Sequence, residues 1–140
     1  MTLSYKPRNL PDMIPYLVVQ NPKKSLEFYQ NAFGFEVIDK VLDDAGNLQH
    51  VEMQRGPIVI MFCPEGAMGT TAKSPASRGT EEAISLYCYC ENVDKVYEQA
   101  MKNGATSPMS PEDHFWGDRM CVLLDLDNYK WCFATHLNGK

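Results

Sequence analysis

Apolar residues along this chain form strand-like runs in some segments and a helical stripe in others, and the same order of segments occurs twice. An apolar run at 16–20 precedes residues 22–33, in which the apolar side chains fall on one helical stripe. A second apolar run at 86–90 precedes residues 93–103, which show the same helical stripe. The pattern predicts a strand followed by a helix in each half of the chain.

Capping residues support both helices. Asn21 and Asn92 stand where a side-chain oxygen can accept the first free backbone amides, and Pro22 suits a first helical turn. Gly34 and Gly104 follow the two stripes and can adopt the left-handed conformation that ends a helix. We therefore expect the helices to end at these glycines.

After each helix the period changes to that of strands. In the first half, segments 35–43, 48–55 and 57–63 alternate or run apolar, with a turn at 44–47. In the second half, the corresponding strands are a broken one around 106–110, then 120–124 and 130–136. Each half is thus predicted to be strand, helix, strand, strand, strand.

Two segments lack a period. Residues 64–82 are rich in Gly, Ser, Thr, Pro and Ala and are expected to be the loop between the halves. Residues 108–119 carry aromatic and charged side chains, which favours a lid or ligand rim over a simple connector. With only 140 residues, we expect one α+β domain over 1–140: module one at about 13–63, a linker loop at 64–82 and module two at 83–137.

Charge and composition exclude some classes of partner. A net charge of -5 argues against nucleic acid, because that affinity depends on clustered Lys and Arg. No apolar run approaches the length of a membrane span, and the first residues do not resemble a signal peptide. We expect a cytoplasmic protein without a membrane partner, whose 5 cysteines are reduced.

Several motifs, in this order, resemble the vicinal oxygen chelate superfamily. It includes glyoxalase I, extradiol dioxygenases, fosfomycin-resistance enzymes and bleomycin-resistance binding proteins. The Trp-Gly-Asp-Arg stretch is similar to its bacterial glyoxalase-like branch, often labelled with the phosphonate-operon protein PhnB. The residues that carry the resemblance are Ser25-Leu26-Glu27-Phe28-Tyr29, Asn92-Val93-Asp94, Phe115-Trp116-Gly117-Asp118-Arg119 and Asp125-Leu126-Asp127-Asn128.

The resemblance implies two βαβββ modules of the glyoxalase/bleomycin resistance fold, which form a curved mixed-sheet cup with helices on its outer face. It also implies a homodimer. In members that use a metal, the ligands come from the first and last strands of each module. The matching positions here are Ile14, Ile60 or Met61, Ser85 and Cys132. These side chains are poor ligands for a divalent ion, so we expect neither a metal nor another cofactor.

His50 and Glu52 are the remaining candidates for acid-base or metal chemistry. They alternate with Val51 and Met53, which places the two polar side chains together on the face away from the helices. The pair could transfer protons. Alternatively, it is a polar strand face or a pair of hydrogen-bonding groups that orients a ligand.

The predicted cup lining is mostly aromatic and apolar, as small-molecule pockets are. Tyr87 and Tyr89 could instead pack between the modules. Arg119 could recognise a ligand carboxylate or phosphate, or form ion pairs with acidic neighbours. The candidate ligand-binding residues are Tyr16, His50, Glu52, Met61, Tyr87, Tyr89, Phe115, Trp116, Arg119 and Cys132.

Two classes of function follow. The first is a metal-independent binding protein for a planar or amphipathic small molecule, with no catalytic residue. The second is a lyase, isomerase or dioxygenase that uses a non-standard metal site or the His50 and Glu52 proton-transfer pair. The lack of suitable metal ligands favours the first class.

Overall fold

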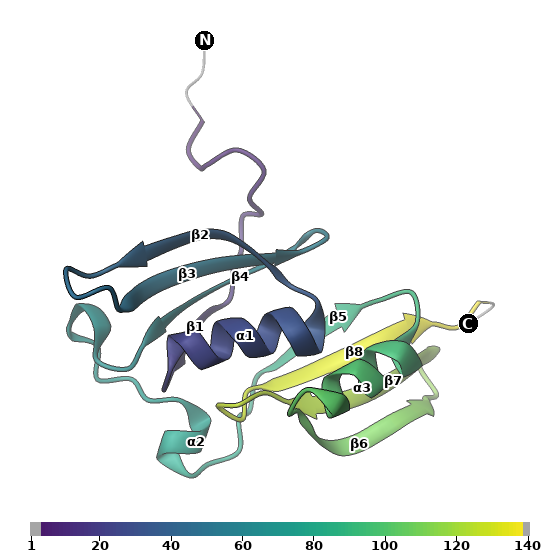
Figure 1. Cartoon of the computed structure of the whole chain (residues 1–140). Helices are drawn as coiled ribbons and strands as arrows, with labels where there is room; N and C mark the ends of the chain where they lie inside the picture. Colours follow the sequence, from purple (N-terminus) through teal and green to yellow (C-terminus); the bar gives the residue numbers. More distant parts are fainter. Residues whose placement is uncertain (1–3, 139–140) are drawn as a thin grey trace.

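The chain folds into two modules, each with one mixed four-stranded sheet and one long helix (Figure 1). The computed structural model describes residues 4–138. Module one contains β1 (Tyr16–Val19), α1 (Pro22–Phe33), β2 (Glu36–Leu42), β3 (Leu48–Arg55) and β4 (Ile58–Pro64). Module two contains β5 (Ser85–Tyr89), α3 (Val93–Lys102), β6 (Thr106–Asp113), β7 (Asp118–Leu124) and β8 (Lys130–His136).

Both sheets have the same topology. The strand orders are β1-β4-β3-β2 and β5-β8-β7-β6, and in each sheet the first and last strands of the module pair in parallel. The other pairs are antiparallel. The predicted α+β fold of two βαβββ modules with helices outside the sheets is confirmed.

The capping residues act as the sequence indicates. The Asn21 side chain accepts from the Lys24 amide at 3.2 Å, and Gly34 ends α1 with a φ of 73°. The Asn92 side chain accepts from the Lys95 amide at 3.1 Å. The second helix stops slightly earlier than expected, at Lys102, because Asn103 and not Gly104 follows its last turn.

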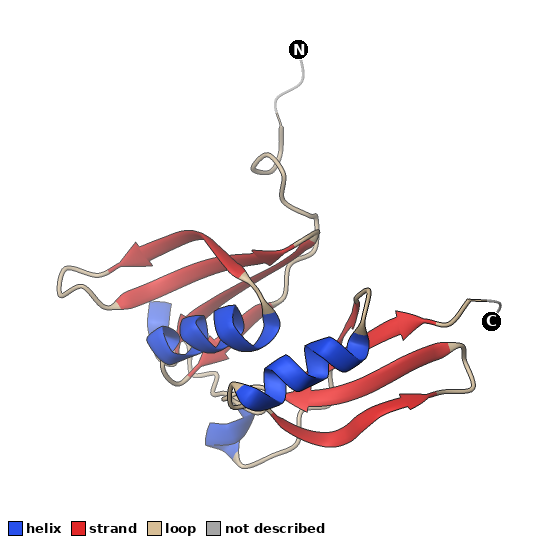
Figure 2. Ribbon diagram, turned by 45° about the vertical axis from the view of Figure 1, so that its right-hand side comes forward, coloured by secondary structure: helices blue, strands red, loops and turns tan. Residues whose placement is uncertain are grey.

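One hydrophobic core joins the modules. Tyr29 of α1 contacts Phe62 of β4 and Trp131 of β8, with ring centroids 5.5 and 5.6 Å apart. Trp131 is fully buried and also contacts Phe33 of α1, with ring centroids 5.1 Å apart. Figure 2 shows α1 and α3 running next to each other, each along one face of a sheet. No helix formed by residues 4–138 covers the opposite face of either sheet (Figure 2).

The turn between β7 and β8 also ties the modules together. The Tyr129 hydroxyl accepts a hydrogen bond of 3.2 Å from the Val18 amide and donates one of 2.8 Å to the Val18 carbonyl. The Asp127 carboxylate accepts from the Gln20 amide at 2.9 Å. Side chains of module two therefore satisfy backbone groups on the outer edge of β1, in the place of a neighbouring strand.

One prediction about an irregular segment is wrong. Residues 108–119 do not form an irregular lid, because β6 continues to Asp113 and a short turn at 114–117 leads into β7. Pro108 and Pro111 suggested a break, but β6 is an edge strand, where missing amide donors are tolerated. The loop between the modules contains two short helical turns, η1 (Ala67–Gly69) and α2 (Pro75–Arg78). No helix within residues 4–138 is long and apolar enough to cross a membrane.

Candidate functional site

Strand register brings one group of predicted site residues together on the helix-free face of the first sheet. Met61 on β4 is the register partner of Tyr16 on β1 and of Glu52 on β3. His50 lies two positions from Glu52 and shares its face. Val51 and Met53 point to the other side and are fully buried, so the predicted alternation along β3 is confirmed.

Tyr16, His50 and Glu52 form a chain of hydrogen bonds. Tyr16 Oη lies 2.7 Å from His50 Nδ1, and His50 Nε2 lies 2.7 Å from Glu52 Oε2. The His50 and Glu52 side chains are 23% and 17% exposed, whereas Tyr16 is 43% exposed. These hydrogen bonds thus run from an accessible phenol to a largely covered carboxylate. Sequence spacing did not indicate the link between Tyr16 and the His50–Glu52 pair.

The second group lies on the helix-free face of the other sheet, around Asp118. Its Oδ2 accepts from the hydroxyls of Tyr87 and Tyr89 at 2.7 and 2.8 Å, and its Oδ1 lies 3.0 Å from His136 Nδ1. These bonds, above all the one with His136, lower the pKa of Asp118 to about 2. Burial, reinforced by the hydrogen bond to Asp118, raises the pKa of Tyr87 to about 12. The carboxylate stays charged and the phenols stay protonated.

Trp116 extends this arrangement. Its Nε1 donates to the Tyr87 hydroxyl at 3.1 Å, and its ring stacks on His114 at 4.5 Å between centroids. Phe115 meets Trp116 edge-on at 5.1 Å and is itself 94% exposed. We call the four exposed rings the aromatic platform: Tyr87, Tyr89, Phe115 and Trp116.

Sequence reasoning missed Asp118 and His136 as site residues. Asp118 is 2% exposed and holds two of the platform rings. Its register partner across β7 and β8 is His136. The available signal was strand alternation, which places Asp118 on the opposite face from Arg119.

A groove of about 670 Å³ lies beside the platform. It is lined by β5 from Tyr87 to Tyr89, by the turn between β3 and β4 at Gly56 and Pro57, and by the start of α3 at Lys95 and Val96. Phe115 and Trp116 do not line it. This volume falls within the roughly 300–1,000 Å³ that ligand sites occupy.

Neither Arg119 nor Cys132 belongs to the aromatic platform. Arg119 forms two hydrogen bonds of 3.0 Å with Asp94 of α3 and one of 3.1 Å with Asp113 of β6. Its guanidinium therefore joins helix to sheet, which fits the ion-pair alternative. Cys132 is the register partner of Tyr87 but is only 6% exposed, and burial raises the pKa of its thiol.

The two groups remain separate. Within residues 4–138, no hydrogen bond or ring contact joins the Tyr16 group to the aromatic platform. The structure therefore brings together Tyr16, His50, Glu52 and Met61 on one sheet, and Tyr87, Tyr89, Phe115 and Trp116 on the other.

The donor set does not fit the metal centre that the superfamily's enzymes use. In the described part of the chain, no three His, Cys, Asp or Glu side chains are grouped closely enough to hold an ion. The positions matched to ligands hold Ile14, Met61, Ser85 and Cys132, and the last of these is buried. We derive no chemical step through a metal.

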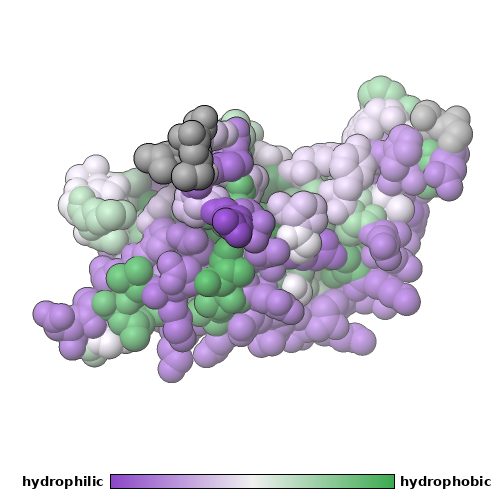
Figure 3. Space-filling view, turned by 90° about the horizontal axis from the view of Figure 1, so that it is seen from above, coloured by the Kyte–Doolittle hydropathy of each residue, from purple (hydrophilic) through white to green (hydrophobic). Residues whose placement is uncertain are grey.

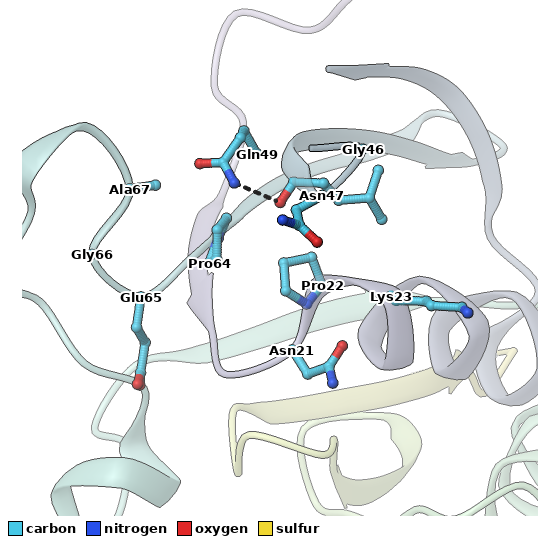
Figure 4. A pocket seen from close by; sticks show the side chains of 11 residues that line it. Asn21, Pro22, Lys23, Gly46, Asn47, Gln49, Pro64, Glu65, Gly66 and Ala67 are labelled. Atoms are coloured by element: carbon cyan, nitrogen blue, oxygen red, sulfur yellow. Dashed lines mark hydrogen bonds between the residues drawn. The ribbon is translucent and has the colours of Figure 1, made fainter. Parts of the chain in front are cut away.

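A further pocket of about 520 Å³ opens between the start of α1, the turn before β3 and the segment after β4 (Figure 4). Its polar side chains serve local structure. Asn21 caps α1, Gln49 donates to the Leu48 carbonyl, and Glu65 accepts from the Ser74 amide. It contains none of the predicted site residues.

A family model for the Glyoxalase/Bleomycin resistance protein/Dioxygenase superfamily matches residues 13–133, so the chain belongs to this superfamily. An uncharacterized protein of Mycobacterium bovis is 27% identical over 123 residues, which cover 86% of this chain and 80% of that protein.

Two solved structures are similar in fold. TioX from a Micromonospora species has a TM-score of 0.73 at 21% identity, covering 91% of this chain and 99% of its own. A glyoxalase/bleomycin resistance protein/dioxygenase family enzyme from Burkholderia phytofirmans has a TM-score of 0.68 at 20% identity, covering 87% and 95%. At these identities the similarity concerns the fold alone.

Proposed function

We propose that the protein binds a planar or amphipathic small molecule on the aromatic platform and does so without a metal. The observation that carries this proposal is the hydrogen bonding of Tyr87, Tyr89 and Trp116 around Asp118. These bonds hold three partly exposed rings in fixed orientations before any ligand arrives. A preorganised aromatic surface loses little entropy on binding and offers ring faces for stacking.

Exposure supports a binding role over packing. Tyr87, Tyr89 and Trp116 are 42%, 58% and 45% exposed, so much of each ring remains available. The adjoining groove reaches two of the four rings, Tyr87 and Tyr89. Among the residues that the structure describes, Tyr89 contacts the ring of Tyr87 and no aromatic ring of module one, which supports binding over packing between the modules.

The test is a thermal-shift screen of planar aromatic compounds, because a ligand that binds only the folded state raises its apparent stability. Compounds that stabilise the protein are then titrated while tryptophan fluorescence is followed. Quenching should occur in the wild type and disappear in Trp116→Ala, where only the buried Trp131 remains. Undiminished affinity in Trp116→Ala would overturn the proposed site.

Metal independence has its own test. Protein purified without chelator is analysed for metal and titrated with Mn²⁺, Fe²⁺, Ni²⁺ and Zn²⁺. Stoichiometric tight binding of one of these ions would favour an enzyme of the superfamily with displaced ligands.

The second candidate function is proton transfer in a lyase or isomerase reaction. The 2.7 Å hydrogen bond between His50 and Glu52 favours it, because a carboxylate that orients an imidazole is a common device in general acid-base catalysis. Loss of a measured turnover in His50→Gln, with the platform ligand still bound, would support this candidate over pure binding.

We also propose that the protein is a cytoplasmic homodimer. Exposed apolar side chains on β2, including Val41 at 50% and Leu42 at 51%, support an interaction surface. Figure 3 shows separate hydrophobic patches among hydrophilic side chains on the face seen from above. Sedimentation that shows a monomer at micromolar concentration would contradict the dimer.

A further inference from the structure

The hydrogen-bonded chain of Tyr16, His50 and Glu52 is independent of the aromatic platform. The three side chains come from β1 and β3 of the first sheet, and all of their mutual contacts are made within module one. The rings of Tyr16 and His50 are 5.4 Å apart and tilted by 45°, so the phenol lies against the imidazole it contacts.

The carboxylate decides which nitrogen of His50 carries the proton. An ionised Glu52 can only accept, so Nε2 must donate to it across the 2.7 Å contact. In the neutral imidazole Nδ1 then has no proton and accepts from the Tyr16 hydroxyl, also at 2.7 Å. The hydrogen bonds are thus all donated in one direction, from Tyr16 to His50 and from His50 to Glu52.

The Tyr16 hydroxyl can still accept a hydrogen bond but has no second proton to donate. Its proton is used toward His50, and its oxygen can accept a further hydrogen bond on a side chain that is 43% exposed and has the Cys63 thiol as a second close neighbour. Burial, followed by the nearby Cys63 thiol, raises the pKa of Tyr16, so the phenol does not ionise by itself. A ligand that meets this oxygen therefore has to supply a proton.

The geometry points to a binding site for the acidic hydroxyl group of a small molecule, such as a phenol or an enol, with Tyr16 as the contact and His50 as the proton acceptor. The ligand O–H bond breaks and its proton forms a new O–H bond with Tyr16. The earlier Tyr16 proton moves to His50 Nδ1, and the electron pair stays on the ligand oxygen. The ligand is then held as an anion and His50 as an imidazolium.

Every hydrogen bond of the chain survives this transfer. Before it, the ligand donates to Tyr16, Tyr16 to His50, and His50 to Glu52. After it, His50 donates to both neighbours and Tyr16 donates to the ligand anion. Only protons move, and the heavy atoms can keep their 2.7 Å separations.

Carboxylates lie beside His50 on β3 and β2. Glu52 lies directly against its Nε2, and Asp39 on β2 is the register partner of Glu52. On β4, the groups nearest the chain are the neutral Met61 side chain and the Cys63 thiol, whose pKa burial raises. Among residues 4–138, no Lys or Arg side chain hydrogen-bonds to Tyr16, His50 or Glu52, and from module two Lys130 lines the same pocket as Tyr16, together with Glu82 of the loop before β5.

The probe is p-nitrophenol, whose ionised form has its own absorption band, compared with p-nitroanisole, which has the same ring and no acidic proton. At a pH below the pKa of free p-nitrophenol, the wild-type protein should bind it and produce the nitrophenolate band. The affinities of the two compounds are compared in Trp116→Ala, which removes binding at the aromatic platform, and there p-nitroanisole should bind at least tenfold more weakly. Equal binding of the two compounds in this variant, or binding of p-nitrophenol with its neutral spectrum, would overturn the inference.

Variants separate proton transfer from simple contact. Tyr16→Phe keeps the ring and should abolish the nitrophenolate band. Glu52→Gln can still accept from His50 but carries no charge, so the band should weaken about tenfold while the fold, checked by circular dichroism, is retained. Tyr97→Phe on α3, outside both groups of site residues, is the matched control and should behave as the wild type. An unchanged band in Tyr16→Phe would contradict the assignment, whatever the outcome at the aromatic platform.

Discussion

The hydroxyl of Tyr29 donates a hydrogen bond of 2.6 Å to Oδ2 of Asp125, and both side chains are buried. Tyr29 belongs to α1 of module one, and Asp125 begins the turn between β7 and β8 of module two. Trp131 Nε1 donates to the same oxygen at 3.0 Å, and the amides of Asp127 and Tyr129 donate to Oδ1. One carboxylate thus organises the contact between the modules.

Tyr29→Phe should lower the free energy of unfolding by about 1–3 kcal/mol, because it removes one donor to a buried carboxylate and keeps the ring that fills the core. Urea denaturation measures the change. Tyr97→Phe is the control, since the Tyr97 hydroxyl makes no hydrogen bond to any described side chain or backbone group and its loss should be near neutral. Equal effects of the two substitutions would remove the special role of Tyr29.

Asp125 should make stability fall as the pH rises through the mildly acidic range. Burial raises its pKa from 3.8 to about 6, so between these values the folded state binds more protons than the unfolded chain. Its contribution is present below pH 3.8 and is lost as the pH passes about 6. In Asp125→Asn, denaturation series between pH 4 and 6 should show a smaller downward slope than in the wild type. An unchanged slope would assign the pH dependence to other groups.

Asp118 should act in the opposite direction. Its pKa is lowered from 3.8 to about 2, first of all by the hydrogen bond with His136, so its contribution to stability is complete above pH 3.8 and is lost as the pH falls through 2. The melting temperature of Asp118→Asn should therefore be below that of the wild type at pH 7, and the difference should shrink on acidification. A difference that stays constant down to pH 2 would contradict this linkage.

The two tryptophans should respond differently to truncation. Trp131 is fully buried, and Trp131→Ala should cost about 3–5 kcal/mol. Trp116 is 45% exposed on a turn, so Trp116→Ala should change the free energy of unfolding by about 1 kcal/mol or less while weakening ligand binding. Thermal unfolding of both variants checks this contrast. A large loss of stability in Trp116→Ala would assign Trp116 to the core.

Local signals in the sequence predicted the architecture well. Asn21 and Asn92 cap their helices as expected, and the alternation of His50 and Glu52 with Val51 and Met53 gives the correct faces of β3. These features depend on neighbours within a few residues, so spacing alone reveals them.

Contacts between distant strands could not be predicted in the same way. Asp118 gains its role from Tyr87, Tyr89 and His136, which lie on two other strands, and no local pattern shows that their side chains converge. The link between Tyr16 and His50 likewise crosses β4 and requires the register of three strands. The extent of β6 was missed because prolines are read as breaks unless the strand is known to lie at an edge.

The prolines of β6 have one more effect. An edge strand normally offers free amide donors on which a foreign strand can assemble, and this is a common route to aggregation. Pro108 and Pro111 remove two amide hydrogens from this outermost strand of the second sheet. Concentrated solutions of the protein should therefore resist fibril growth from this side, and exchanging these prolines for alanine or threonine should make it less soluble.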